Sequence, residues 1–127
     1  MRIVVAEPQA PGAGAEPRVA ALVAGLRHRG HDVETVALPF RGDPASILAE
    51  AAAWRLLDLS MAGGRTIDLL IAAGFPAYFA RHPRKIAWLI HRRDVPHDLM
   101  ELDTRMRGEC ARVVTAPDGA AVEQLLG

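Results

Sequence analysis

The chain has 127 residues, half of them hydrophobic, and its 15 basic residues balance 15 acidic ones. This size fits a single domain, residues 1–127, with a core of its own, and the charge balance gives no indication of nucleic acid as a partner. The lone Cys110 excludes an intrachain disulfide, and no apolar run approaches the roughly 18 residues of a transmembrane segment, so we expect a cytoplasmic protein.

Apolar runs and helical periodicities alternate along the chain. Short runs rich in apolar and β-branched residues predict strands over 2–6, 31–38, 67–73, 85–91 and 111–116. Apolar residues at helical spacing predict helices over 17–29, 43–60, 96–110 and 119–126. The first strand meets Glu7 and Pro8 too early for a signal peptide, and Gly63 and Gly64 predict a plain connection.

Strands that alternate with helices indicate right-handed crossovers. The fold class we expect is therefore α/β, a three-layer Rossmann-like sandwich whose mainly parallel sheet has strand one at its centre. In such sheets, ligands bind just outside the carboxyl ends of the strands. We accordingly expect one functional edge, and the residues predicted to gather there are Gly12, Gly14, Phe75, His91 and Thr115.

The loop over 11–15 contains Gly12 and Gly14 between the first strand and the first helix. Its main-chain NH groups and the helix N-terminus could hold an anion, but a glycine pair is also typical of a tight turn. The third glycine of a dinucleotide fingerprint is replaced by Pro17, and strand two ends without a ribose-binding acid. The sequence therefore predicts no nicotinamide cofactor, and no other cofactor.

His91 lies at the expected end of strand four, and Arg92, Arg93 and Asp94 follow it. A histidine there can donate a hydrogen bond to a hydroxyl or phosphate oxygen, although a histidine at this position is more often just the polar end of a strand. Arg92 and Arg93 would favour an anionic group. The histidines show no metal-ligand spacing, so no metal site is predicted. Cys110, on the apolar stripe of its helix, is expected to be buried, and Trp54 and Trp88 to be core or interface aromatics.

Several short segments, in order, resemble one protein family. They are GHDV (30–33), LPF (38–40), AWRLLDLS (53–60), FPAY (75–78), RHPRK (81–85), WLIH (88–91) and DL (98–99). Together they resemble the N-terminal domain of family 4 glycosyltransferases of the GT-B fold. The resemblance implies a nucleotide-sugar-dependent enzyme of two Rossmann-like domains, the first holding mainly the acceptor and the second mainly the donor.

The resemblance covers only the acceptor-side domain. The expected function is therefore the acceptor half of a glycosyltransferase, inactive without a donor-binding domain or partner chain, with a nucleotide sugar and an unknown acceptor as ligands. In this interpretation His91 is the catalytic-site residue, and the substrate-binding residues are Gly12, Gly14, Phe75, Arg92, Arg93 and Thr115. The alternative is a non-catalytic Rossmann-like module that pairs with another chain, with a homodimer as one form of this pairing.

Overall fold

The computed structural model describes residues 1–90 and 95–126, and these form a three-layer α/β sandwich. Its central parallel sheet has the order β2-β1-β5-β6-β7. These strands are β1 (Arg2–Gln9), β2 (Asp32–Pro39), β5 (Leu69–Ala73), β6 (Lys85–Leu89) and β7 (Arg112–Thr115). The helices are α1 (Pro17–His28), α2 (Ile47–Leu56), α3 (Met100–Gly108) and α4 (Ala120–Leu125), with short 3-10 turns η1 (Ala77–Phe79) and η2 (His97–Leu99).

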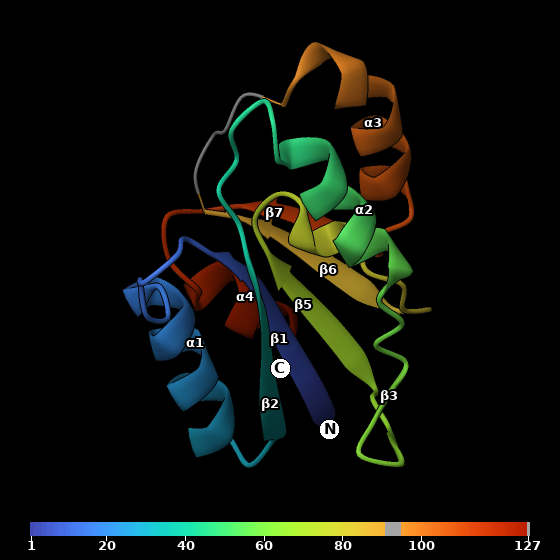
Figure 1. The fold of residues 1–127 in the computed structure, drawn as a ribbon. Coiled ribbons are helices and arrows are strands. Elements are labelled where there is room, and N and C mark those ends of the chain that lie inside the picture. The colour runs from blue at the N-terminus through green and yellow to red at the C-terminus, as the bar shows by residue number, and fades with distance from the viewer. Residues whose placement is uncertain (91–94, 127) are drawn as a thin grey trace.

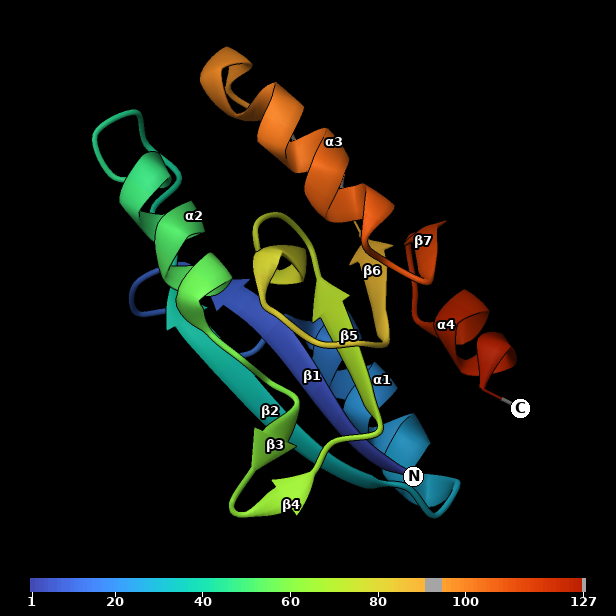
Figure 2. The ribbon, with the colours of Figure 1, turned by 90° about the vertical axis from the view of Figure 1, so that its right-hand side faces the viewer.

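Helices cover both faces of the sheet, as Figure 1 and Figure 2 show. On one face, α1 and α4 bury apolar side chains such as Leu22, Leu26 and Val122 against the strands. On the other face, α2, η1 and α3 enclose a second apolar cluster around Trp54 and Phe79. Every residue of β5 is buried, because both of its faces are covered. The Rossmann-like α/β fold expected from the sequence is therefore confirmed.

The sheet changes its direction of growth next to β1. The chain leaves β1 through α1 to β2 on one side, then crosses by α2 over the other face to β5. β1 is thus an interior strand, paired with β2 and β5, but the middle strand is β5, because β6 and β7 both add beyond it. The position between β1 and β5 is a topological switch point, where ligands bind in open α/β sheets.

A small hairpin that the sequence analysis missed lies between α2 and β5. It pairs β3 (Met61–Ala62) with β4 (Arg65–Thr66) across Gly63 and Gly64, whose φ angles are 58° and 77°. Two successive positive φ angles are what a tight hairpin turn requires, and glycine adopts them without steric cost. The Arg2 side chain bonds to Asp32, to Glu34 and to the Ala62 carbonyl, and so ties β1, β2 and the hairpin together.

Other boundaries also shift from the predicted ones. Helix α2 begins at Ile47 instead of residue 43, because residues 43–46 form a turn in which Asp43 accepts a hydrogen bond from the Ser46 amide. Helix α3 is preceded by the turn η2. Among residues 1–90 and 95–126, no helix has the length and apolarity needed to cross a membrane.

Trp88 supplies a test of the packing. Its side chain, on the interior strand β6, is fully buried, and its indole Nε1 donates a hydrogen bond of 3.1 Å to the Ala116 carbonyl. We expect Trp88→Ala to lower the free energy of unfolding by about 3 to 5 kcal/mol, because it leaves a large cavity. The control, Met61→Ala at a side chain that is 56% exposed, should change it by no more than about 0.5 kcal/mol. Urea titration measures both, and similar losses in the two variants would contradict the packing described.

Candidate functional site

A cleft of about 770 Å³ lies at the carboxyl edge of the sheet. The ends of β1, β5, β6 and β7 all reach it, and α1 and α3 form its rims. It is lined by Glu7, Pro8, Glu16, Val19, Ala73, Gly74, Phe75, Tyr78, Leu89, Ile90, Val95, Met100, Asp103, Thr104, Arg107 and Thr115. The cleft spans the switch point between β1 and β5, so its place is the one that the fold favours for a ligand.

The residues after β5 form an aromatic wall of the cleft. Gly74 has a φ of 89°, which turns the chain sharply at the strand end, and Phe75 and Tyr78 follow as buried side chains. The Phe75 ring packs edge-to-face against Phe40, Tyr78 and Phe79, with centroid separations of 6.3, 6.2 and 5.4 Å. This packing fixes the position of the turn, so the wall is preformed.

Two glutamates lie on the β1 and α1 side of the cleft. Glu7 is 6% exposed, and its carboxylate accepts hydrogen bonds from the Gln9 side chain at 3.0 Å and the Glu16 amide at 3.3 Å. Glu16 caps helix α1: one oxygen accepts from the amides of Arg18 and Val19, and the other from the Arg18 side chain. Burial alone would raise the pKa of Glu16, but these hydrogen bonds and the Arg18 charge lower it below the ordinary value.

The Glu16 cap bears directly on the predicted anion site. The first amides of α1 bond to the Glu16 carboxylate, so they are already occupied by a negative group of the chain itself. Gly12 and Gly14 lie on an exposed loop before this helix and do not line the cleft. An anion bound by the loop would therefore have to displace Glu16 or use other donors.

On the opposite rim, α3 contributes a polar group that the sequence analysis missed. Asp103 is buried and accepts a hydrogen bond from the Tyr78 hydroxyl on one oxygen. Its other oxygen pairs with Arg107 Nε at 3.0 Å, one helical turn along. Burial of Tyr78 and, after it, its hydrogen bond to the Asp103 carboxylate raise the pKa of Tyr78 far above its ordinary value, so the phenol stays a donor.

A buried lysine holds the base of this assembly. The Lys85 ammonium, 1% exposed, donates to the carbonyls of Tyr78 at 2.8 Å and Ala80 at 3.0 Å, and to Glu109 at 3.3 Å. Burial would raise the pKa of Glu109, but the hydrogen bond and charge of Lys85, with a smaller contribution from Arg55, lower it. The Lys85 ammonium therefore joins the start of β6 to the turn η1 and to the end of α3.

The structure brings together some of the predicted site residues and separates others. Phe75 and Thr115 both line the cleft, from the ends of β5 and β7, whereas Gly12 and Gly14 do not. His91, Arg92 and Arg93 lie outside the described residues, and their predicted roles remain predictions. Ile90 and Val95, which precede and follow this segment in the chain, line the cleft.

Sequence reasoning missed Glu7, Tyr78, Asp103 and Arg107 as cleft residues. Two signals were present: Glu7 interrupts an apolar strand, and Asp103 and Arg107 stand four residues apart on one helix. Cys110 is partly rather than fully buried, and burial raises the pKa of its thiol. Within residues 1–90 and 95–126, no three His, Cys, Asp or Glu side chains are placed to hold a metal ion.

The Glu16 cap gives a pH-dependent prediction. A carboxylate with a lowered pKa stabilises the fold fully above its ordinary value of 4.5, and this contribution disappears as the pH falls through the lowered pKa. We expect Glu16→Ala to lower the free energy of unfolding by about 0.5 to 2 kcal/mol at pH 7, and the difference from the unsubstituted chain to shrink below pH 4.5.

Urea titrations at pH 7, 5, 4 and 3 measure this difference. Asp98→Ala is the control, since Asp98 is exposed and accepts no hydrogen bond within the described part of the chain. A Glu16→Ala difference that stays constant down to pH 3 would show that the carboxylate charge does not act as the cap.

Comparison with known proteins gives no match to the chain, neither from a protein-family model nor from a curated protein nor from a solved structure.

Proposed function

We propose that the chain is the acceptor-side half of a nucleotide-sugar-dependent glycosyltransferase. The observation that carries this proposal is the cleft at the carboxyl edge, with apolar walls and carboxylates at the β1 and α1 rim. The sequence resemblance described above supports the same function, because it points to the acceptor-binding domain of a two-domain enzyme. The proposed reaction is transfer of a glycosyl group from a nucleotide sugar to an acceptor hydroxyl.

The lining suits a molecule with hydroxyl groups on an apolar frame. Carboxylate oxygens accept hydrogen bonds, so Glu7 and Glu16 can accept hydrogen bonds from the hydroxyl groups of an acceptor. The Glu7 carboxylate has about four acceptor positions, of which two are used within the described chain. Phe75, Leu89 and Val95 offer apolar contacts of the kind that the faces of a sugar ring or a lipid chain require.

The cleft is open on one side, which agrees with an enzyme in which one domain binds the acceptor and a second domain binds the donor. A donor-binding domain over the carboxyl edge would exclude water and strengthen each polar contact inside the cleft. Without it, the chain offers a nucleotide sugar a few contacts on one side only. We therefore assign donor binding mainly to a second domain or partner chain.

The proposal predicts how the isolated chain behaves. We expect no glycosyl transfer, and nucleotide sugars should bind with a dissociation constant no tighter than about 1 mM, as judged by isothermal titration. When a donor-binding domain is supplied, fused or as a second chain, transfer should appear. Glu7→Gln should then lower kcat/KM by about 10 to 100-fold, because an amide retains only one acceptor oxygen.

The control is Gln124→Glu on helix α4, which also exchanges an amide and a carboxylate but at an exposed position that does not line the cleft. It should leave kcat/KM unchanged. Micromolar binding of a nucleotide sugar by the isolated chain would contradict the division of labour. Continued inactivity with several donor-binding domains and acceptor classes would contradict the reaction itself.

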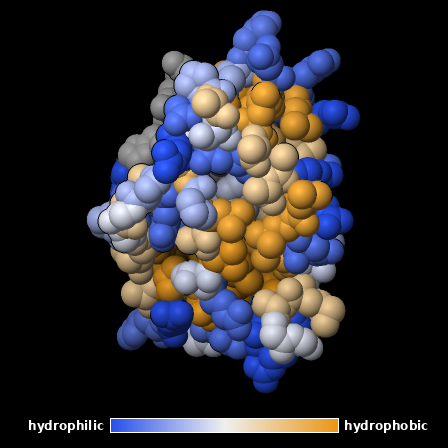
Figure 3. Space-filling view, in the orientation of Figure 1, coloured by the Kyte–Doolittle hydropathy of each residue, from blue (hydrophilic) through white to orange (hydrophobic). Residues whose placement is uncertain are grey.

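The outer face of α2 favours a second candidate function, an assembly module. Leu48 and Leu56 are 57% and 78% exposed, and Ala52 lies between them on the same stripe of the helix. Figure 3 shows apolar residues gathered on this side of the molecule. By contrast, the exposed residues of α1 are Pro17, alanines, Arg27 and His28. Exposed apolar stripes of this kind are typical of interaction surfaces.

The partner we propose for this stripe is a second copy of the chain. Positions 48, 52 and 56 are evenly spaced, so an antiparallel two-fold pairing about Ala52 places each Leu48 opposite the partner's Leu56. The small side chain at the centre lets the two helices approach closely. The stripe is therefore complementary to itself.

Sedimentation velocity over about 10 to 500 μM tests the pairing. We expect a reversible dimer with a dissociation constant in the micromolar range, and at least about tenfold weaker association in Leu56→Glu, which places a charge in the apolar contact. Leu125→Glu, at an exposed leucine of α4, should leave the dimer unchanged. A chain that stays monomeric at 500 μM, or equal effects of the two substitutions, would exclude this interface.

A further inference from the structure

We propose that Arg107 is an anion-binding residue of the cleft, held by Asp103 and Tyr78 so that its terminal NH2 groups take a carboxylate or phosphate of the ligand. The proposal deepens the proposed function and rests on it only for the nature of that ligand. It implies that the acceptor or donor bound in the cleft carries a negatively charged group. The binding of an anion by Arg107 can be tested by itself.

Among the described residues, the contacts of Arg107 leave its hydrogen-bonding capacity largely unused. Its side chain is 43% exposed and lines the cleft, and its Nε lies 3.0 Å from an Asp103 oxygen in an ion pair. A guanidinium has five N–H donors, and Asp103 is the one partner of the Arg107 side chain within the described part of the chain. The four donors on the terminal nitrogens form the planar fork that suits a carboxylate or a phosphate.

Asp103 is placed to orient this arginine. The Asp103 side chain is 3% exposed, and its second oxygen accepts the Tyr78 hydroxyl hydrogen bond. Tyr78 in turn is buried between Phe75 and Phe79, with centroid separations of 6.2 and 5.5 Å. The carboxylate therefore has little freedom to rotate, unlike the partners of an ordinary surface ion pair. A buried charge needs this hydrogen bonding, and the result is a fixed anchor for Arg107.

The geometry of the ion pair distinguishes ligand binding from simple charge neutralisation. Neutralisation of a carboxylate by arginine is strongest when two parallel N–H groups bond to two oxygens. Here Tyr78 occupies one Asp103 oxygen, and Arg107 reaches the other through Nε. Among residues 1–90 and 95–126, the fork therefore has no partner and is available to another anion. Since Asp103 is buried beneath the rim and Arg107 is exposed in the cleft, a cleft ligand can reach it.

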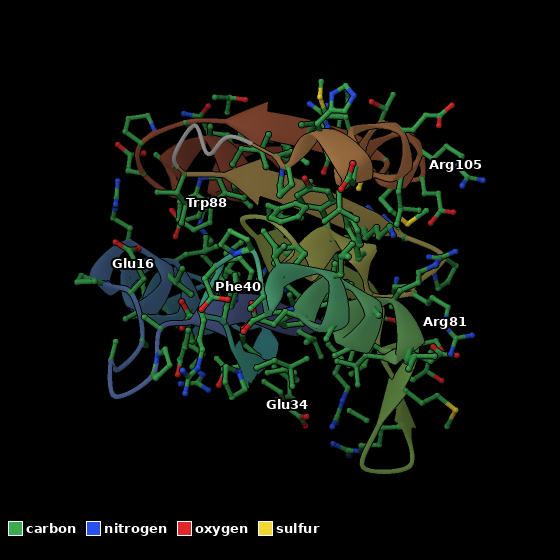
Figure 4. All side chains as sticks on the ribbon, turned by 45° about the horizontal axis from the view of Figure 1, so that its top comes forward. Glu16, Glu34, Phe40, Arg81, Trp88 and Arg105 are labelled. Atoms are coloured by element: carbon green, nitrogen blue, oxygen red, sulfur yellow. The ribbon has the colours of Figure 1, made fainter. Side chains whose placement is uncertain are left out.

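Arg105 lies on the same helix as Arg107, but its side chain is not held by a buried carboxylate of the described chain. It is exposed, it does not line the cleft, and no described residue bonds to its side chain. Figure 4 shows its side chain directed outward from α3. It has the same charge two positions away, so it is a matched control for effects of net charge alone.

The distribution of charge specifies the class of ligand. Arg107 lies on the α3 rim, whereas Glu7 and Glu16 lie on the β1 and α1 side, with apolar residues such as Leu89 between them. A ligand with an oxyanion at one end and hydroxyl groups at the other matches both rims. A sugar phosphate and a sugar acid are acceptors of this class, and the diphosphate of a sugar donor has the same oxyanion chemistry.

Titration with inorganic phosphate, followed by the NMR signals of the backbone amides of α3 and of the arginine Nε–H groups, tests the anion site. We expect one saturable shift at millimolar phosphate, in the Arg107 Nε–H and in the α3 amides next to it, and the amide signals remain observable in every variant. Arg107→Gln should abolish it, while Arg105→Gln should change the affinity by less than about twofold. Arg107→Lys retains the charge but lacks the fork, so phosphate should bind at least about tenfold more weakly, with no comparable change for chloride.

Tyr78→Phe tests the anchoring. It removes the bond that holds Asp103 but leaves the charges of Asp103 and Arg107, so phosphate affinity should fall by about 3 to 10-fold, as expected for loss of a positioning contact. The amide spectrum reports whether this variant is folded, and if it is not, the comparison of Arg107→Lys with Arg105→Gln decides. Phosphate binding that survives Arg107→Gln, or no binding at all at 100 mM, would overturn the proposal.

Two further ligands distinguish the sources of the anion. Tighter binding of glucose 1-phosphate than of uridine diphosphate assigns Arg107 to an anionic acceptor, and the reverse order assigns it to the donor. Both assignments require that Arg107→Gln loses the binding.

The proposed function and the proposed anion site can fail separately. Phosphate binding that depends on Arg107, without transfer in the completed enzyme, would contradict only the glycosyltransferase. Transfer without such binding would contradict only the site.

Discussion

The buried ammonium of Lys85 is the interaction on which the cleft depends most. A charge in the protein interior must be fully hydrogen-bonded, because its removal from water is costly. Lys85 meets this requirement with the carbonyls of Tyr78 and Ala80 and with Glu109. Two of these partners lie in the turn after β5, and Glu109 directly follows α3. The Lys85 ammonium therefore fixes both the turn and the end of the helix. Tyr78, on that same turn, then reaches Asp103, and the α3 rim of the cleft is fixed to the sheet from below.

The position of the cleft follows from the topology and needs no special sequence. Growth of the sheet in both directions from β1 places α1 on one face and α2 on the other, which opens the carboxyl edge between β1 and β5. The identity of the lining, in contrast, comes from particular residues. Glu7 extends β1 beyond its apolar part, and Gly74 turns the chain so that Phe75 forms a wall. The topology thus determines where the cleft lies, and a few side chains determine which groups line it.

The fold could be predicted from the sequence because apolar runs and helix signals are local. Continuous burial of residues 69–73 and the full burial of Trp88 both follow from such runs, and both are confirmed. The hairpin at 61–66 was missed because strands of two residues have no periodicity, although Gly63-Gly64 is a hairpin signal. Phe75 and Thr115 could be placed at the carboxyl edge since each follows or ends a strand. The pairing of Tyr78 with Asp103 could not, since it joins residues 25 apart through packing that no local pattern encodes.

The capped N-terminus of α1 sets this domain apart from the usual arrangement in which phosphate binds at the first helix of a Rossmann-like fold. In that arrangement the first amides of the helix are free and face the ligand. Here the Glu16 carboxylate bonds to the amides of Arg18 and Val19, and buried Glu7 adds a second acidic group nearby. Carboxylate oxygens at this rim accept hydrogen bonds, so they suit hydroxyl donors better than an anion. On the α3 rim, Asp103 forms an ion pair with Arg107 at Nε, and among the described residues the terminal nitrogens of this exposed arginine have no partner. A ligand of the proposed class would thus place its hydroxyl groups toward the first helix and its negative charge toward α3, the reverse of the fold's usual arrangement.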